Sequence, residues 1–268
     1  MNRDLAQIEF NFPKGQFRDK KELTAAIIAQ MKENGSTAYS GYANLELLKQ
    51  GLLDHIGSGN IGQYSDEIYH QKINELRKVI LQTIEKCNSY LAIPTKNFIF
   101  INPYLTVDED EVFEGVMAVA VYSCAFHLFI NLSEYSNDSL INTIAHEINH
   151  TIYYYNHFDN FNNYSLLDEI ILEGLAENFR EQLFNPQTSK WAGALSKQQA
   201  FDLLEKSSDI LSSRDKVLIK NFLFGSDKYP KWAGYSAGYW LVKEYLNQHK
   251  NLTWNDAMKL PSQDILKT

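Results

Sequence analysis

The chain has 268 residues, of which 44% are apolar, and it carries a formal net charge of −8. This length and apolar content suffice for one large core or for two lobes that share a cleft. The acidic balance argues against nucleic acid as the main partner, because phosphate binding needs a basic surface.

The chain has only two cysteines, Cys87 and Cys124. A disulfide framework needs more, so we expect each to be a small buried hydrophobic residue. The first fifteen residues lack the apolar run of a signal peptide, and no stretch approaches the roughly 20 apolar residues of a membrane helix. We therefore expect a soluble, cytoplasmic protein without a membrane partner, or a secreted one if a leader has been removed.

Residues 1–94 are expected to form a mainly helical N-terminal segment. Residues 5–12 alternate loosely between apolar and polar types, which predicts a short strand. Apolar residues at helical spacing predict helices over 20–33, 42–53 and 64–90. The last is the longest, which favours a role in packing.

Residues 95–268 are expected to form the core of the protein. Three apolar runs, at 98–102, 116–123 and 126–132, predict a small β-sheet. Its outer strand can pair with an extended peptide by adding one more strand. His127 lies within the third run, and we interpret it as a core or sheet-face histidine with satisfied hydrogen bonds and not as a catalytic residue. The acidic cluster at 108–111 lacks calcium-loop spacing and is interpreted as a solvated turn.

The stretch TIAHEINHTIYYY, residues 143–155, contains the pattern H-E-x-x-H at His146, Glu147 and His150. An apolar stripe from Leu140 to Ile148 predicts a helix here, preceded by N-cap residue types at 137–139. In a helix the two histidines stand one turn apart on one face, where they can bind one zinc ion. Glu147 then lies beside the metal, where a carboxylate can take a proton from the attacking water.

A second helix is predicted for SLLDEIILEGLAENFREQLF, with Ser165 and Asp168 at capping-box positions. Three glutamates, Glu169, Glu173 and Glu177, recur every four residues and form what we call the acidic seam. The rest of this helix is apolar almost all round, so we expect the helix to be buried and the seam to serve a site.

A hydrolytic zinc site usually takes three protein ligands, and the acidic seam offers the third. Glu169 follows His150 after 18 intervening residues and Glu173 after 22. Spacing alone does not decide between them. Further helices are predicted over 196–212, 214–224 and 235–249, the last with Tyr235 and Tyr239 one turn apart.

HEINH, then EGLAENF, then AGYSAGY together resemble the predicted zinc-dependent proteases of the YjaZ-like kind. These belong with the gluzincins, H-E-x-x-H metallopeptidases whose third ligand is a glutamate. The resemblance spans residues 95–268. It implies an α+β, zincin-like metallopeptidase with a small β-sheet, mostly helical lobes and a Zn²⁺ cofactor.

The resemblance also implies roles for individual residues. The Glu-Gly context of the third ligand assigns that role to Glu173, with Glu169 as the alternative. Glu177 would orient a ligand histidine. Tyr235, with Tyr239 as the alternative, would donate a hydrogen bond to the oxyanion. The implied reaction is hydrolysis of a peptide bond in a peptide or protein substrate, with Glu147 as the general base.

Two other interpretations remain open. The chain can hydrolyse a different amide, or bind zinc without turnover as a regulatory or partner-binding module. Alternatively, it is a structural helical domain in which the H-E-x-x-H pattern has arisen by chance. The substrate, the mode of cleavage and the oligomeric state do not follow from the sequence.

Overall fold

The protein is described here from a computed structural model, which describes residues 8–11, 19–33, 66–93, 97–102, 114–122, 125–132, 135–157, 163–184 and 187–267. The chain forms two compact units. The first comprises Met1–Ser89 and Ile93–Thr151, and the second comprises Tyr90–Ala92 and Ile152–Thr268. The expectations for residues 42–53, residues 108–111 and Cys124 fall outside the described residues.

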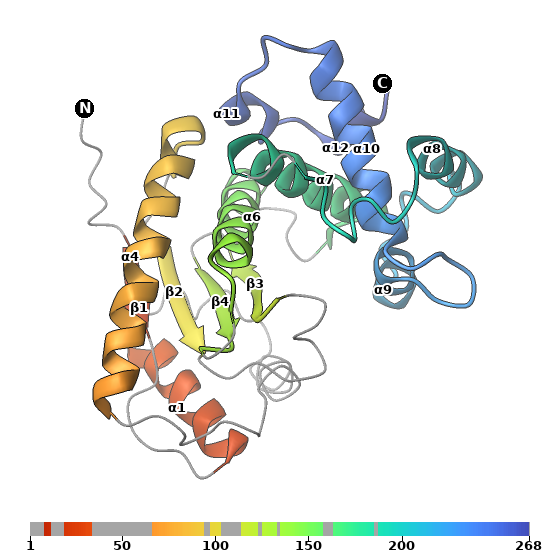
Figure 1. Cartoon of the computed structure of the whole chain (residues 1–268). Coiled ribbons are helices and arrows are strands. Elements are labelled where there is room, and N and C mark those ends of the chain that lie inside the picture. Colours follow the sequence, from red (N-terminus) through yellow and green to blue (C-terminus); the bar gives the residue numbers. More distant parts are fainter. Residues whose placement is uncertain are drawn as a thin grey trace. The chain divides into compact units, whose positions relative to one another are not determined.

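The first unit is mixed α and β. Its elements are β1 (Ile8–Asn11), α1 (Lys20–Glu33), α4 (Asp66–Tyr90), β2 (Asn97–Asn102), β3 (Val116–Tyr122), β4 (Ala125–Ile130) and most of α6 (Asn137–Asn156) (Figure 1). The helices predicted over 20–33 and 64–90 and the four predicted strands are confirmed, with ends that shift by a few residues.

The four strands form one sheet in the order β1-β2-β4-β3. The pairs β1–β2 and β2–β4 are parallel, whereas β3 pairs with β4 in the antiparallel direction. Every residue of β4 is buried, so both faces of this strand are covered. Strand β3 is an edge of the sheet formed by the described strands.

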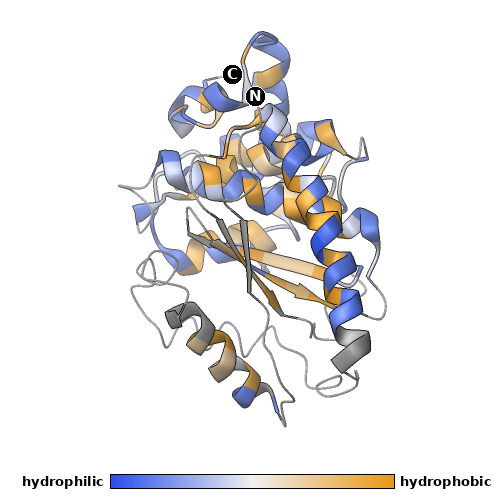
Figure 2. Ribbon diagram, turned by 90° about the vertical axis from the view of Figure 1, so that its left-hand side faces the viewer, coloured by the Kyte–Doolittle hydropathy of each residue, from blue (hydrophilic) through white to orange (hydrophobic). Residues whose placement is uncertain are grey.

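Helix α4 buries one apolar stripe and exposes polar residues on the opposite side, a division visible in Figure 2. The stripe consists of residues at helical spacing, each at most 1% exposed: Ile73, Leu76, Ile80, Ile84 and Cys87. The expectation that Cys87 is a buried hydrophobic residue is confirmed, and burial raises the pKa of its thiol to about 12.

The N-cap of helix α6 lies one residue before the predicted N-cap positions 137–139, and the helix itself begins at Asn137. The side chain of Ser136 accepts a hydrogen bond from the backbone N–H of Ser139 at 2.9 Å, which makes Ser136 the N-cap. The predicted apolar stripe is confirmed, because Leu140, Ile144 and Ile148 are fully buried.

The second unit is helical over its described residues. Its helices are α7 (Leu166–Leu183), α8 (Lys197–Lys206), α9 (Lys216–Phe224), α10 (Ala233–Gln248), α11 (Trp254–Ala257) and α12 (Ser262–Leu266), together with the end of α6. The capping box predicted for Ser165 and Asp168 is present at the start of α7. The protein is therefore mixed α and β and mostly helical, as predicted.

Helices α7 and α10 cross at two glycines. A Cβ atom built on Gly174 would lie 2.2 Å from the carbonyl oxygen of Gly238, and one on Gly238 would lie 2.0 Å from the carbonyl oxygen of Ile170. Both distances are far below van der Waals contact, so only glycine permits this approach of the two backbones. The side-chain amide of Asn178 joins the same pair by donating to Gly174 O at 2.8 Å and Tyr239 O at 3.0 Å.

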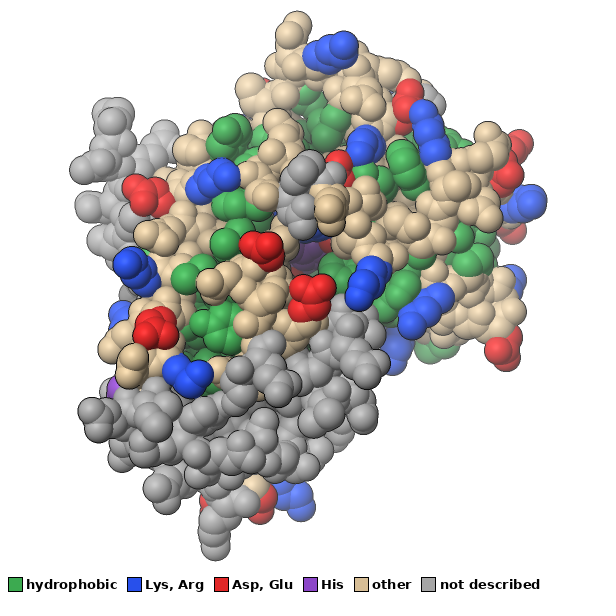
Figure 3. Space-filling model, viewed as in Figure 1, with side chains coloured by type: hydrophobic (Ala, Val, Ile, Leu, Met, Phe, Trp, Pro, Cys, Tyr) green, Lys and Arg blue, Asp and Glu red, His purple; other side chains and the backbone are tan. Residues whose placement is uncertain are grey.

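The surface of the described part shows acidic and basic side chains interspersed, without a patch of one sign on the face in Figure 3. None of the helices in the described ranges is both long enough and apolar enough to cross a membrane.

Candidate metal centre

Helix α6 brings His146, Glu147 and His150 together, as the H-E-x-x-H spacing predicts. Their potential ligand atoms lie within 4.8 Å of one another. The two imidazole rings meet edge to face, with their centroids 4.4 Å apart. Glu147 and His150 are buried, and His146 is partly exposed. A helix turn thus places two nitrogen ligands and one carboxylate around a common point, a donor set that suits zinc.

Glu147 is also fixed by the sheet. Its Oε2 accepts a hydrogen bond from the backbone N–H of Ala120 at 2.5 Å. Ala120 lies on β3, an edge strand among the described strands, so the contact joins α6, which carries the candidate metal centre, to the strand expected to receive an extended peptide. A carboxylate held by a charge-assisted hydrogen bond keeps one orientation, which favours proton transfer at a defined position.

His127 lies in the middle of β4, and its side chain is 1% exposed. Its ring stacks on Phe100 with centroids 4.9 Å apart, and neither ring nitrogen has a hydrogen-bond partner among the residues that the structure describes. Burial lowers the pKa of His127 to about 3. The interpretation of His127 as a core histidine is confirmed, whereas the expectation that its ring nitrogens are satisfied by hydrogen bonds is wrong within the described part of the chain.

The acidic seam lies on α7, in the second unit. Glu173 is 8% exposed and Glu177 is fully buried, whereas Glu169 is partly exposed. The prediction that this helix is buried is confirmed, since all its residues from Ile170 to Arg180 are buried. Glu169 acts electrostatically on two tyrosines of the same unit, Tyr153 and Tyr164. Burial raises the pKa of both hydroxyls, and nearby negative charge, including that of Glu169, adds to the rise.

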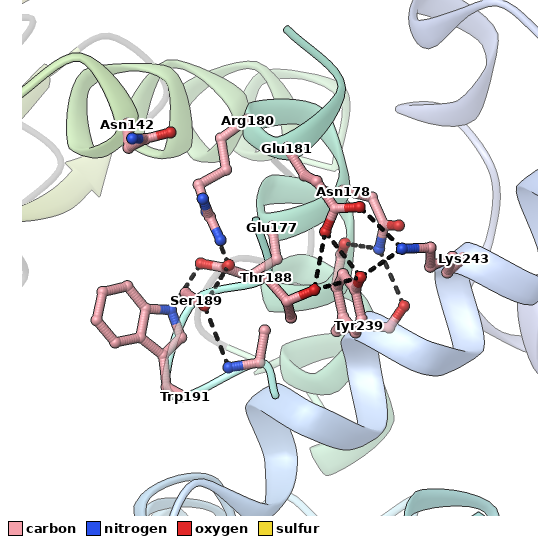
Figure 4. Close-up of polar contacts among 12 residues, drawn as sticks. Asn142, Glu177, Asn178, Arg180, Glu181, Thr188, Ser189, Trp191, Tyr239 and Lys243 are labelled. Atoms are coloured by element: carbon pink, nitrogen blue, oxygen red, sulfur yellow. Dashed lines mark hydrogen bonds and ion pairs between the residues drawn. The ribbon is translucent and has the colours of Figure 1, made fainter. Parts of the chain in front are cut away.

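Glu177 binds three donors, so its burial is compensated (Figure 4). Its Oε1 accepts from Trp191 Nε1 at 2.7 Å, and its Oε2 accepts from Ser189 Oγ at 2.7 Å and Arg180 Nε at 2.8 Å. Ser189 and Trp191 belong to residues 187–195, which we call the strap. This carboxylate therefore holds the strap against α7.

Tyr239 belongs to a second polar cluster at the same strap, also drawn in Figure 4. Its hydroxyl donates to Glu181 Oε2 at 2.7 Å, lies 3.0 Å from Thr188 Oγ1 and accepts a hydrogen bond from Lys243. Lys243 also donates to Glu181 Oε1 at 2.8 Å. The side chain of Tyr239 is fully buried. The three residues that bind its hydroxyl all belong to the second unit.

Tyr235 has a different environment. It is partly exposed, and its ring lies 5.5 Å from that of Trp232 and 5.7 Å from that of Phe224, between centroids. Trp232 has a left-handed backbone with φ of 60°, which is rare for a large side chain and marks a constrained turn before α10. Tyr235 is therefore held by aromatic packing at the start of that helix.

Sequence reasoning missed the amide of Ala120 as a partner of Glu147. Every residue type except proline has a backbone N–H, so the amino-acid sequence does not show which amide of a strand binds a side chain. Only the alternation of the strand could have indicated which amides point outward at the edge of the sheet. It also missed the strap, whose serine, threonine and tryptophan have no helical or strand periodicity.

Comparisons with known proteins point to one family. The profile of the family described as "Predicted Zn-dependent protease (DUF2268)" matches residues 74–267. Two *Bacillus subtilis* (strain 168) proteins are similar. "Uncharacterized protein YjaZ" is 37% identical over 107 residues, covering 38% of this chain and 40% of the relative. "Uncharacterized protein YjfC" is 25% identical over 151 residues, covering 52% of this chain and 50% of the relative.

The aligned part thus spans half or less of each curated relative's length. No solved structure matches the chain. The family match covers both the metal-binding helix and the acidic seam, and extends over α10 to α12. On this evidence the chain belongs to the family of predicted zinc-dependent proteases.

Proposed function

We propose that the protein is a zinc-dependent peptidase that hydrolyses peptide bonds with Glu147 as its general base. The observation that carries the proposal is the compact group of His146, Glu147 and His150 on one helix turn. The family match supports the same chemistry. A zincin-like fold is part of the proposal.

Three residues would hold the metal: His146, His150 and Glu173. Two imidazoles and one carboxylate form a common ligand set of hydrolytic zinc sites, which keep a further position for water or substrate. We prefer Glu173 as the third ligand because its side chain is buried on the helix that bears the acidic seam and because it stands in the Glu-Gly context that the family resemblance implies. Glu169 is partly exposed and faces the tyrosines.

Zinc at this position supplies a Lewis acid for the scissile carbonyl and for the attacking water. Glu147 then removes a proton from the water and later delivers it to the leaving amine. The hydrogen bond from Ala120 holds one carboxylate oxygen, which limits rotation of the group between these two transfers. The place of Glu147 beside both histidines and the edge strand supports this role.

Tyr235 would donate a hydrogen bond to the oxyanion that forms during attack. The choice of Tyr235 over Tyr239 is supported by the hydroxyl of Tyr239, which already donates to Glu181. An extended peptide would pair with the edge strand β3, where backbone hydrogen bonds supply affinity without strict sequence preference.

Elemental analysis and a cleavage screen test the proposal together. Protein purified without chelators should contain about one zinc per chain and cleave members of a peptide library, and removal of zinc should abolish cleavage. Zinc without any cleavage would favour a binding or regulatory role. Absence of zinc from protein that binds none on titration would overturn the proposal.

A further inference from the structure

Residues 254–262, which we call the clasp, connect distant parts of the second unit. Trp254 Nε1 donates to Gln182 Oε1 at 3.1 Å, near the end of α7. The side chain of Asn255 accepts from the backbone N–H of Ala92 at 3.0 Å, just after α4. The clasp therefore reaches two segments that are 163 and 72 residues away in the sequence.

Two further contacts attach the clasp to the end of α6. The Oγ of Ser262 lies 3.2 Å from the hydroxyl of Tyr153, and the carbonyl oxygen of Met258 lies 3.1 Å from Nε2 of His157. Tyr153 and His157 are one turn apart, and their rings stack with centroids 4.2 Å apart. The clasp thus contacts one face at the C-terminal end of α6, the helix that carries His146 and His150.

Ser262 also binds the start of α7. Its hydroxyl donates to Asp168 Oδ1 at 2.7 Å. The other oxygen of Asp168 accepts from both the backbone N–H and the hydroxyl of Ser165, which closes the capping box. Ser262 is 5% exposed and Tyr153 is 1% exposed, so this junction is shielded from water.

The direction of the hydrogen bonds follows from the chemistry. An ionised carboxylate only accepts, so the single hydroxyl proton of Ser262 points to Asp168. Tyr153 must then donate to Ser262. Burial raises the pKa of Tyr153, and the charges of Asp168 and Glu169 add to the rise against the opposing effect of Ser262, so its hydroxyl keeps its proton. One serine therefore joins α6 to α7 through the relay Tyr153–Ser262–Asp168.

We propose that Ser262 is a positioning residue of the metal site, acting through the helices that carry the ligands. The inference rests on the proposed function, in which α6 supplies His146 and His150 and α7 supplies Glu173. Tyr153 lies one turn beyond His150, and Asp168 lies five residues before Glu173. A junction so near to both sets of ligands limits how far the helices can shift or rotate, and ligand geometry governs zinc affinity.

The test compares Ser262→Ala with Ser236→Ala by titrating zinc against a chromophoric chelator. Ser236 is an apt control because it is fully buried and also makes two hydrogen bonds in the second unit, with the backbone of Trp191 and Leu195. Both variants should lower the melting temperature of the zinc-free protein. Only Ser262→Ala should weaken zinc binding, by about tenfold or more, as loss of a supporting hydrogen bond does at other sites.

Tyr153→Phe is the second variant, because it keeps the ring and removes only the donor to Ser262. It should weaken zinc binding in the same direction, and it serves alone if Ser262→Ala does not fold. Unchanged zinc affinity in the folded variants, or an equal loss in Ser236→Ala, would overturn the inference while leaving the proposed function intact. Failure of the unmodified protein to bind zinc would overturn both.

Discussion

Glu147 on helix α6 accepts a hydrogen bond from the backbone amide of Ala120 on the edge strand β3. The same side chain stands with His146 and His150 in the candidate metal centre. The carboxylate of Glu147 thus links the candidate metal centre to the strand along which we expect a peptide substrate to lie. Substitutions of Glu147 can therefore separate its chemical role from its structural one.

Replacement of Glu147 by glutamine should abolish peptidase activity and leave zinc content and melting temperature close to those of the unmodified protein. The amide oxygen of glutamine still accepts a hydrogen bond from Ala120, but glutamine cannot take a proton from water. We expect a loss of at least about a hundredfold in kcat. Elemental analysis, thermal denaturation and cleavage of a peptide identified in the screen measure these three quantities.

Glu147→Ala provides the comparison, because it removes the acceptor as well as the base. It should be inactive and also less stable, by about 1–3 kcal/mol if the amide of Ala120 is left without a partner. Retention of full activity by Glu147→Gln would exclude Glu147 as the general base.

Helices α7 and α10 meet at Gly174 and Gly238, so alanine at either position should destabilise the protein. The added methyl group would overlap a backbone carbonyl at about 2 Å, which the helices can relieve only by moving apart. We expect a loss of roughly 3 kcal/mol or more, which exceeds the helix propensity gained on replacing glycine by alanine. Urea denaturation of each variant measures the change in the free energy of unfolding.

Gly193→Ala is a matched control in the same unit, because its nearest neighbour would be Ser189 O at 3.2 Å and the next would be atoms of a threonine side chain. Its effect should stay within about 1 kcal/mol. Equal stabilities of Gly174→Ala, Gly238→Ala and the unmodified protein would show that the close crossing of α7 and α10 is absent in solution.

His127 should make the protein sensitive to acid. Its pKa is about 3 in the folded protein against 6.5 for an unperturbed histidine, so below pH 6.5 the unfolded chain binds the proton more tightly. The stability that comes from burying neutral His127 is therefore fully present above pH 6.5 and is lost as the pH falls toward 3. His127→Leu removes this dependence, so the variant should gain about 2–3 kcal/mol relative to the unmodified protein between pH 7 and pH 4.5.

Urea denaturation at the two pH values measures this difference, which does not depend on what leucine costs at pH 7. A difference between His127→Leu and the unmodified protein that stays constant with pH would mean that His127 is not buried in the neutral form.

Elements with a strong period were predictable from the sequence. The apolar stripes of α4 and α6 and the alternation of the strands each arise within a single segment, where burial of one face selects the residue types. The three residues of the H-E-x-x-H group come together for the same reason, because one helix turn fixes their distances. Local geometry thus accounts for all that was predicted about the metal centre on α6.

Contacts between distant segments were not predictable. Ser262 binds Asp168 and Tyr153 across 94 and 109 residues, and a single serine carries no periodic signal. Gly174 was interpreted only as the context of a ligand, yet its lack of a side chain is required by Gly238, 64 residues later. The residue types required at such positions depend on how two helices cross, and the pattern within a single segment does not show which other segment it will contact.

Glu173→Ala should reduce zinc binding far more than Glu169→Ala. Glu173 is buried, whereas Glu169 is partly exposed. Burial raises the pKa of Tyr153 and Tyr164, and the negative charge of Glu169 raises both pKa values further. Loss of a zinc ligand should weaken binding by several orders of magnitude, whereas loss of Glu169 should change it by less than about tenfold.

A second readout makes the two substitutions distinct. Removal of the charge at Glu169 should lower the pKa of Tyr153 and Tyr164, which ultraviolet titration of tyrosinate follows from pH 9 up to the onset of alkaline unfolding. Glu173→Ala should change that titration less, because the negative charges that raise both tyrosine pKa values include that of Glu169. A reversed order of zinc affinities would transfer the ligand role to Glu169, and the seam would then meet the metal one turn closer to the capping box of Ser165 and Asp168.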